Sequence, residues 1–319
     1  MELTVAVWAP VARDPIMKVL AADSALTVRE ANNEAGYLAA LDGADVAILP
    51  GVTPCYTPAV AVAIKASDTV KWVHLISAGH EGPESTGWAD KLFSHPGGAV
   101  SGAVAEHAIA LLGALTRGIS AAVTAQAQGQ WHRDQARKST TLDGGTLLVV
   151  GFGSIGRRVA TIARGFGATV IGVSRSGAAR PEADEIVTGD ALADVIGEAD
   201  FIISALPQTD ATHHLFDAAM FARCKPGARF VNVGRGSSVD QVALREALES
   251  GQLGGAGLDV TDPEPLPAGD PLWTAPNIII TAHYAGAGDR RSGQKIAEGL
   301  TRNLSLFRAR ERLDYQIDV

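Results

Sequence analysis

Short runs of apolar residues recur along the chain and alternate with longer segments in which apolar and polar residues mix. The runs are rich in Val, Ile and Leu, and most of them are continuous, without regular apolar–polar alternation. They occur at residues 3–8, 45–50, 71–77, 145–151, 168–174, 200–206, 228–234, 255–260 and 277–281. Strands of a parallel sheet are covered by helices on both faces, so continuous apolar runs are typical of them.

Helical segments are predicted between these strands. They cover residues 57–66, 155–166, 190–199, 217–223 and 239–250. Strands that alternate with helices of this length form βαβ units. The pattern therefore predicts an α/β fold built on doubly wound parallel sheets.

The length of 319 residues predicts about two domains. Two regions have the character of crossings between domains, the long helix 102–117 and the glycine-rich stretch 285–289. We therefore expect one domain at residues 1–99 and 286–319, and the other at residues 100–285. The last helix has one apolar stripe, formed by Ile296, Leu300, Leu304 and Phe307. This stripe is expected to pack back onto the first domain.

Composition narrows the class of protein. Apolar residues make up 46% of the chain and the formal net charge is −8, which favours a globular protein and argues against nucleic acid as a partner. No run reaches the roughly 18 to 20 apolar residues that span a bilayer, so no membrane partner is expected. The cysteines, Cys55 and Cys224, are too few and too far apart for a disulfide framework, which favours a cytoplasmic location.

The strongest local motif is Gly151-Phe152-Gly153-Ser154-Ile155-Gly156, which follows an apolar strand and opens a predicted helix. In this context each glycine has a physical role in binding a dinucleotide. Gly151 permits the tight turn, Gly153 lets the backbone approach the pyrophosphate, and Gly156 allows close contact between helix and strand. The helix N-terminus then offers free N–H groups to the phosphates.

The end of the following strand indicates which dinucleotide binds. An acidic side chain there would accept hydrogen bonds from a ribose 2′-hydroxyl, but this chain has Ser174-Arg175-Ser176. A guanidinium and two hydroxyls favour a 2′-phosphate, so we expect NADP(H). The alternative is that Arg175 points to water and NAD(H) binds. The ends of the next two strands are also expected to contact the cofactor, at Leu206, Pro207, Val233 and Gly234.

Three further residues lie directly after predicted strands or in the loops that follow them: Arg235, Glu264 and His283. Ligands of open α/β sheets bind beyond the carboxyl ends of the strands, so these loops are where reactive side chains are expected. Metal binding is not expected at His80, His132, His213 or His214, which share no ligand spacing.

Several strings together resemble the D-isomer-specific 2-hydroxyacid dehydrogenase family. They are GFGSIG, NVGRGSSVD, GLDVTDPEPLP and NIIITAHYAG, with support from VAEHAIALLGALTR, ALPQTDATHHLFD and VHLISAG. The resemblance covers nearly the whole chain. It implies two Rossmann-like domains with a cleft between them, a homodimer, and reversible reduction of 2-keto acids. The strings are similar to those of glyoxylate/hydroxypyruvate reductases, which favours a small substrate.

The family's roles carry over to matching positions. Arg235 matches the arginine that binds the substrate carboxylate and polarises the keto oxygen, a task that suits a permanently charged planar fork of donors. His283 matches the acid/base, because a pKa near 7 lets imidazole give and take a proton. Glu264 matches its carboxylate partner, and Asp259 matches an aspartate beside the nicotinamide carboxamide. The backbone N–H groups of Ala78 and Gly79 resemble the family's carboxylate anchor.

The chain departs from the family pattern next to the histidine, where Ala282 replaces a frequent proline. A nucleotide-sensing interaction protein of the corepressor type, built on the same fold, stays an alternative at this point, since a fold does not fix a function. A formate dehydrogenase is disfavoured, because that relative has a glutamine where this chain has Glu264.

Overall fold

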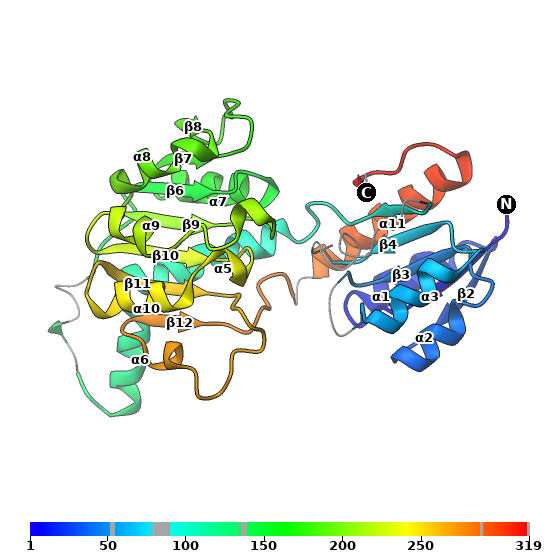
Figure 1. The fold of residues 1–319 in the computed structure, drawn as a ribbon, viewed down its shortest axis with the longest axis horizontal. Coiled ribbons are helices and arrows are strands. Elements are labelled where there is room, and N and C mark those ends of the chain that lie inside the picture. The colour runs from blue at the N-terminus through cyan, green and yellow to red at the C-terminus, as the bar shows by residue number, and fades with distance from the viewer. Residues whose placement is uncertain are drawn as a thin grey trace. The chain divides into compact units, whose positions relative to one another are not determined.

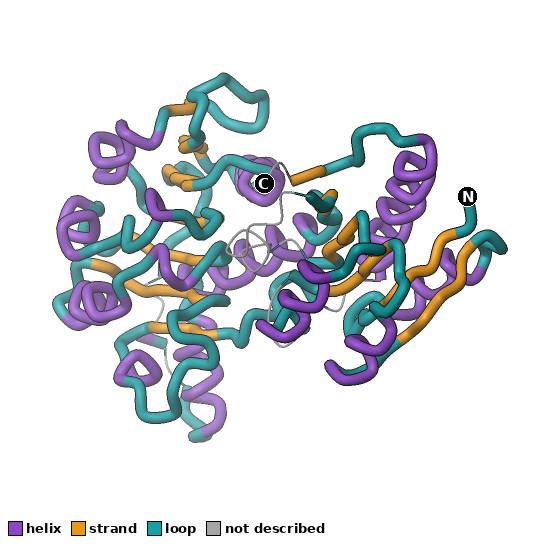
Figure 2. The backbone as a smooth tube through the Cα atoms, turned by 45° about the vertical axis from the view of Figure 1, so that its right-hand side comes forward, coloured by secondary structure: helices purple, strands orange, loops and turns teal. Residues whose placement is uncertain are grey.

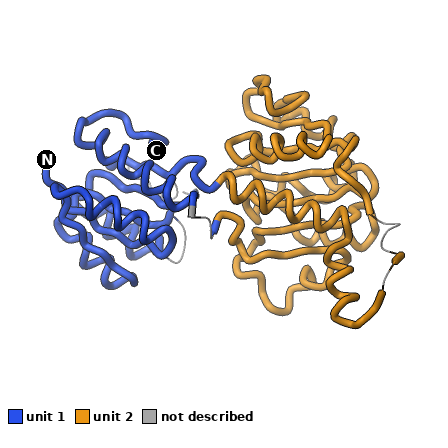
Figure 3. Tube along the Cα trace, turned by 180° about the vertical axis from the view of Figure 1, so that it is seen from behind, with its two compact units in different colours: residues 1–100, 287–319 blue, residues 101–286 orange. Residues whose placement is uncertain are grey.

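The computed structural model describes residues 1–51, 55–77, 79, 90–131, 133–134, 139–287 and 290–317. The chain divides into two compact units (Figure 3). Unit 1 comprises residues 1–100 and 287–319, and unit 2 comprises residues 101–286. Both are α/β units with a central sheet, as predicted, and they are described separately below.

Unit 1 contains a six-stranded sheet in the order β13-β5-β4-β3-β1-β2. Its strands are β1 (Leu3–Val7), β2 (Leu26–Glu30), β3 (Val46–Leu49), β4 (Trp72–Leu75), β5 (Leu92–Ser94) and β13 (Gln316–Ile317). Its helices are α1 (Arg13–Ala21), α2 (Glu34–Ala40), α3 (Pro58–Ala66) and α11 (Arg290–Ala309). One apolar cluster joins α2 and α3 to the sheet, and another joins α1 and α11 to it, so helices cover both faces.

Unit 2 contains a seven-stranded parallel sheet in the order β12-β11-β10-β9-β6-β7-β8 (Figure 1). Its strands are β6 (Thr146–Val150), β7 (Thr169–Val173), β8 (Glu185–Val187), β9 (Phe201–Ser204), β10 (Ala228–Asn232), β11 (Leu253–Leu258) and β12 (Ile278–Ile280). Its α-helices are α5 (Ser101–Thr116), α6 (Ile119–Ala127), α7 (Ser154–Gly165), α8 (Leu192–Val195), α9 (Ala218–Arg223) and α10 (Gln241–Glu249). Figure 2 distinguishes the helices, strands and loops of the backbone by colour.

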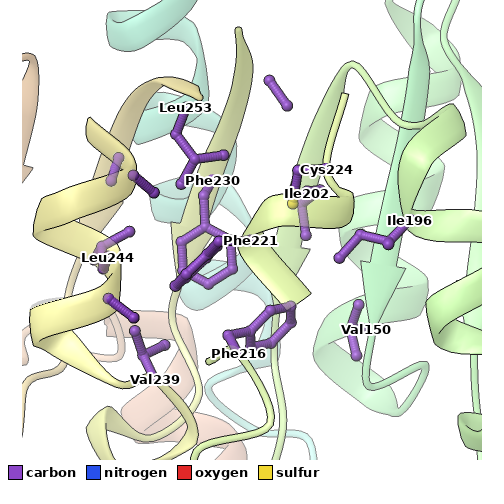
Figure 4. Packing of buried hydrophobic residues seen from close by; sticks show 14 of the residues in the cluster. Val150, Ile196, Ile202, Phe216, Phe221, Cys224, Phe230, Val239, Leu244 and Leu253 are labelled. Atoms are coloured by element: carbon purple, nitrogen blue, oxygen red, sulfur yellow. The ribbon is translucent and has the colours of Figure 1, made fainter. Parts of the chain in front are cut away.

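The core of unit 2 on the α8–α10 side is built around three phenylalanines. Phe216, Phe221 and Phe230 are all at most 1% exposed, and Figure 4 shows them grouped between the sheet and the helices. The ring of Phe230 meets those of Phe216 and Phe221 edge-on, with centroids 4.9 and 5.5 Å apart. Such edge-to-face pairs add to the stabilisation that burial of the rings provides.

Side-chain caps start several helices where the sequence predicted them. Thr57 accepts a hydrogen bond from the amide of Val60 at the start of α3. Asp217 and Asp240 cap α9 and α10 in the same way. Each cap satisfies a helix N–H group that has no partner within the helix.

The structure differs from the predicted elements in three respects. The segment predicted as one helix over residues 190–199 is broken into two 3₁₀ turns around the four residues of α8. The unit 1 sheet is not wholly parallel, because β13 pairs antiparallel with β5. The pattern also missed α1, α2, α6 and the strands β2, β5, β8 and β13.

Two further findings concern the whole chain. Cys55 and Cys224 are both free and buried. Among the described residues no single helix is long and apolar enough to cross a membrane, although α5 and α6 pass that test as a pair bent by 66°.

Candidate active site

The loops that follow β6, β9 and β10 meet at the carboxyl edge of the unit 2 sheet. The strand order reverses between β6 and β9, which is the switch point where open α/β sheets bind ligands. A Cβ on Gly151, after β6, would lie 2.6 Å from the carbonyl oxygen of Ala205, after β9. A Cβ on Gly234, after β10, would lie 2.6 Å from the nitrogen of Leu206. Glycine therefore lets these three backbones stack in direct contact.

The turn from β6 into α7 has room for a ligand. Gly151 has φ +98°, which a residue with a side chain rarely adopts, and a Cβ on Gly156 would collide with the Gly151 carbonyl oxygen. By contrast, a Cβ on Gly153 would meet no atom within 4 Å. Gly153 starts α7 without a side-chain cap, so the first N–H groups of the helix are available to an anion. Ser154 is exposed there, and Ile155 is half-buried.

Phe152 holds the glycine turn against β7. Its backbone nitrogen donates to the carbonyl of Val173 at 2.9 Å, and its side chain is only 7% exposed. A Cβ on Gly172 would lie 2.5 Å from the Phe152 ring, so the ring packs on the bare backbone of β7. This contact ties the glycine turn to the strand whose end was predicted to select the cofactor.

The end of β7 carries no carboxylate at the three positions predicted to select the cofactor. Ser174 is half-buried, and its Oγ accepts a hydrogen bond from Gly177 at 3.2 Å. Arg175 and Ser176 are exposed. Pro207, after β9, is exposed too, and its carbonyl accepts from Thr212 at 2.7 Å.

A buried asparagine fixes the loop that carries Arg235. Asn232 is fully buried, accepts from the amide of Gly234 at 3.0 Å, and donates to the Arg235 carbonyl at 2.9 Å. Ser238 donates to the same carbonyl at 2.8 Å. The guanidinium of Arg235 donates to the Gly234 carbonyl at 2.8 Å, and Val233 is buried beneath the loop. Sequence reasoning missed Asn232, although it is the one polar residue in the strand-end string FVNVG.

His283 and Glu264 form a direct pair on the neighbouring loops. Nδ1 of His283 lies 2.7 Å from Oε2 of Glu264, and Oε1 of Glu264 accepts from the amide of Thr261 at 3.1 Å. The side chains are 46% and 38% exposed. An ionised carboxylate can only accept hydrogen bonds, so Nδ1 carries a proton and Nε2 is left for proton exchange with a reactant.

Charge couples this pair to Arg235. The hydrogen bond to Glu264 raises the pKa of His283, outweighing desolvation and the opposing positive charge of Arg235. Desolvation acts to raise the pKa of Glu264, but the hydrogen bond and charge of His283, the Thr261 amide and the charge of Arg235 together lower it. The structure thus brings Arg235, Glu264 and His283 into one electrostatic neighbourhood, as a proton-transfer site requires.

Asp259 anchors the segment that carries His283. It is 2% exposed. Its Oδ1 accepts from the Thr281 hydroxyl at 2.6 Å and from the amide of Tyr284 at 3.2 Å, and its Oδ2 accepts from the amide of Ala285 at 3.0 Å. The Asp259 carbonyl accepts from the amide of His283 at 2.8 Å. In this structure Asp259 therefore organises residues 281–285.

The predicted substrate anchor belongs to unit 1. Gly79 is buried on the loop after β4, where its carbonyl accepts from Ser77 at 2.9 Å. Ala78, His80 and His132 lie outside the described residues. Within the described part of the chain, no group of three or more His, Cys, Asp or Glu residues is arranged to hold a metal ion.

Comparison with known proteins agrees with this geometry. The family model described as "D-isomer specific 2-hydroxyacid dehydrogenase, NAD binding domain" matches residues 109–285, more than half of the chain. Glyoxylate/hydroxypyruvate reductase B of Citrobacter koseri is 43% identical over 145 residues, 44% of each chain. The chain thus spans less than two thirds of the length of that curated relative.

Two solved structures cover almost the full length. One is a D-isomer specific 2-hydroxyacid dehydrogenase family protein from Aeromonas salmonicida subsp. salmonicida, 32% identical, with a TM-score of 0.85 over 100% of this chain and 99% of the other. The second is a D-isomer specific 2-hydroxyacid dehydrogenase from Xanthobacter autotrophicus in complex with NADPH and MES. It is 25% identical, with a TM-score of 0.82 over 99% of this chain and 97% of the other.

Proposed function

The chain belongs to the D-isomer specific 2-hydroxyacid dehydrogenase family, and on that premise we propose that it reduces a small 2-keto acid to the 2-hydroxy acid with NADPH. The observation that carries the proposal is the 2.7 Å His283–Glu264 pair, under the charge of Arg235, in the same unit as the glycine turn. His283 supplies the proton, Glu264 raises the pKa of His283, and Arg235 supplies a positive charge for the substrate carboxylate.

The glycine turn fits a dinucleotide. The open space at Gly153 and the uncapped start of α7 suit a pyrophosphate. The residues that would hold the cofactor are those of the turn, Gly151–Gly156, the β7 end, Ser174–Ser176, and the strand ends at Leu206, Pro207, Val233 and Gly234. When bound, the reduced nicotinamide supplies the hydride, while the protein supplies orientation and charge.

The protein's own part in the reaction is to position the keto acid and to move a proton. Arg235 binds the carboxylate and polarises the keto oxygen through its planar donors. His283 gives the proton from Nε2 to the oxygen that becomes the hydroxyl, and Glu264 holds the ring through Nδ1 and stabilises its charged form. In the reverse direction neutral His283 takes the proton. Ala78 and Gly79 are proposed to anchor the substrate carboxylate, and Asp259 to contribute beside the nicotinamide.

The substrate assignment is tested by a panel of glyoxylate, hydroxypyruvate, pyruvate and longer 2-keto acids, followed through loss of NADPH absorbance. The name of the Citrobacter koseri relative supports the smaller acids.

We expect Arg235→Ala to lower kcat/KM by roughly 10²- to 10³-fold, because a charged contact to the substrate is lost. Arg245→Ala on α10, where the half-buried Arg245 pairs with Glu249, is the matched control. A wild-type protein that reduces no acid in the panel would contradict the proposal.

Preference for NADPH over NADH is proposed from the β7 end, and the NADPH complex of the Xanthobacter autotrophicus structure supports it. Arg175→Ala should weaken NADPH binding by about tenfold or more, because a charge-assisted contact to the 2′-phosphate is lost. It should leave NADH binding unchanged. Ser174→Asp should move the preference toward NADH, since a carboxylate repels the phosphate and binds a free 2′-hydroxyl. Titration of both cofactors checks this, with the exposed Arg180→Ala as control. A wild-type preference for NADH, unaltered in Arg175→Ala, would exclude the assignment.

The family resemblance also leads us to propose a homodimer. Light scattering against the 33.0 kDa mass of one chain distinguishes a dimer from a monomer.

A further inference from the structure

Helix α5 brings a histidine against the strand end that anchors His283. Leu111 of α5 lies over Gly257 of β11, where an added Cβ would be 3.1 Å from the Leu111 Cβ. His107 precedes Leu111 by four residues, about 6 Å along a helix. Asp259 follows Gly257 by two residues, a nearly equal distance along a strand. The close approach at Gly257 therefore sets His107 beside Asp259.

Among the described residues, His107 contacts Thr281 and Tyr284, which follow β12, and Asp259, which follows β11. Its Nε2 lies 2.9 Å from the Thr281 hydroxyl oxygen and 3.5 Å from Oδ1 of Asp259. The ring meets that of Tyr284 edge-on, with centroids 5.3 Å apart. The side chain is 19% exposed, so water competes little for these contacts.

The direction of these hydrogen bonds follows from proton counting. The Thr281 hydroxyl has one proton, and the 2.6 Å contact with the Asp259 carboxylate takes it, because a carboxylate can only accept. The Thr281 oxygen must then accept from His107, so Nε2 of His107 carries a proton. The result is a directed chain in which His107 donates to Thr281 and Thr281 donates to Asp259.

This chain ends on the residue that shapes the backbone of His283. The carboxylate of Asp259 accepts from the amides of Tyr284 and Ala285, and its backbone carbonyl accepts from the amide of His283. His283 has φ +51°, a left-handed conformation that is unfavourable for a residue with a side chain and persists only where surrounding contacts hold it. The amide hydrogen bonds to Asp259 provide that restraint.

We propose that His107 is a positioning residue for His283 that acts through the Thr281–Asp259 hydrogen bonds. This inference rests on the proposed function, in which His283 exchanges the proton. His107 touches neither His283 nor its partner Glu264 among the contacts described. Its effect is to fix Thr281 and the Asp259 carboxylate in the orientation that holds Tyr284 and Ala285, the two residues directly after His283.

The first test separates the hydrogen bond from simple packing. His107→Leu fills similar space but offers no donor, and it should lower kcat for 2-keto acid reduction by about 10- to 100-fold with little change in KM. His107→Gln places an amide N–H near the position of Nε2 and should restore kcat to within about threefold of wild type. Equal losses in both variants, or no loss in His107→Leu, would overturn the proposal.

A double-mutant cycle tests the route through Thr281. Thr281→Val removes the hydroxyl at nearly constant shape and should lower kcat to a similar extent. The double variant His107→Leu/Thr281→Val should be no slower than the slower single variant, because both changes break one chain. Multiplied losses would show that the two residues act independently. Thr124→Val, which removes an exposed hydroxyl on α6, is the matched control.

Amide hydrogen exchange provides a readout that needs neither cofactor nor substrate. In His107→Leu the amides of Tyr284 and Ala285, which donate to the Asp259 carboxylate, should exchange at least tenfold faster than in wild type, while those of β6 and β9 stay unchanged. If exchange changes as expected but the wild type reduces no 2-keto acid, the proposed function fails and the positioning contact stands. If the wild type is active but these amides and kcat are unaffected, the positioning role alone fails.

Discussion

Two carboxylates divide the work of placing one imidazole. Glu264 contacts the ring of His283 at Nδ1, so it determines the tautomer and the charge of the ring. Asp259 contacts the backbone around His283, so it determines the backbone position from which the imidazole side chain extends. The side chain of Glu264 is 38% exposed, whereas Asp259 is 2% exposed. The exposed one therefore lies where a substrate can reach its partner.

The pKa of His283 gives a test at this scale. In the proposed reduction His283 donates the proton, so activity should fall as pH rises through the pKa of His283. Glu264 raises that pKa, and the falling limb of kcat/KM should therefore lie above the ordinary histidine value of roughly 6.5. Glu264→Gln keeps an acceptor but removes the charge, so the limb should move to lower pH. Reduction rates measured from about pH 5 to pH 9 check this.

The same pKa shifts of His283 and Glu264 make the stability of the fold depend on pH. Because folding raises the pKa of His283, the pair stabilises the fold fully at pH values below the pKa of histidine in the unfolded chain. This stabilisation is lost as pH rises through the pKa of His283 in the folded protein. Because folding lowers the pKa of Glu264, the pair stabilises the fold fully at pH values above the pKa of glutamate in the unfolded chain. This stabilisation is lost as pH falls through the pKa of Glu264 in the folded protein. Both side chains are more than a third exposed, so solvent screening keeps these contributions small. The kinetic shift is thus the sharper measurement, with Glu249→Gln on α10 as its control. An unmoved limb in Glu264→Gln would contradict the role of Glu264.

Part of the site is readable from sequence because parallel strands point their carboxyl ends the same way. The strand-following positions of Arg235, Glu264 and His283 therefore placed them among the expected reactive side chains, and the family resemblance supplied their roles. The contact of His107 with Thr281 could not be predicted in this way, because it joins residues 174 positions apart through the packing of α5 on the sheet. The only signal was a histidine interrupting an apolar helix. Asn232 is similar, since its buried amide satisfies the backbone of its own loop.

At the scale of elements, the β6–α7 turn separates two uses of glycine. Gly156 removes a clash between helix and strand, whereas Gly153 leaves open space. Alanine at these two positions should therefore have different consequences for stability and for ligand binding.

We expect Gly156→Ala to lower the free energy of unfolding by about 1–3 kcal/mol, because its Cβ overlaps the Gly151 carbonyl. Gly153→Ala should change stability by less than about 0.5 kcal/mol, yet weaken NADPH binding, because its Cβ takes the space next to the first N–H groups of α7. Denaturant unfolding and cofactor titration check the pair. Equal stability in the two variants would contradict the assignment of roles.

The strands that the apolar pattern missed share a physical cause. β2 and β8 pair with one neighbour each, and most of their residues are exposed or half-buried. β5 and β13 are three and two residues long. Such strands bury too little surface to leave a continuous apolar run. The central strands β3, β4, β6 and β9 are almost wholly buried, and all four were predicted.

At the scale of the whole molecule, the two units are made from the chain in different ways. Unit 2 is one continuous segment, whereas unit 1 needs the first 100 residues and the C-terminal residues 287–319. Helix α11 supplies Ile296, Leu300 and Leu304 to the cluster that covers one face of the unit 1 sheet. The core of unit 1 is therefore incomplete until the end of the chain has been added.

This arrangement predicts that damage to α11 stays within unit 1. Leu300 is fully buried, so Leu300→Ala should lower the free energy of unfolding of unit 1 by about 2–5 kcal/mol through lost burial and the cavity left behind. Native-state hydrogen exchange should show faster exchange for the amides of β1 and β3 and unchanged exchange for those of β6 and β9. The exposed neighbour Thr301→Ala is the control. Equal loss of protection in both sheets would mean that the two units unfold as one cooperative body, because damage confined to one core would then be felt in the other.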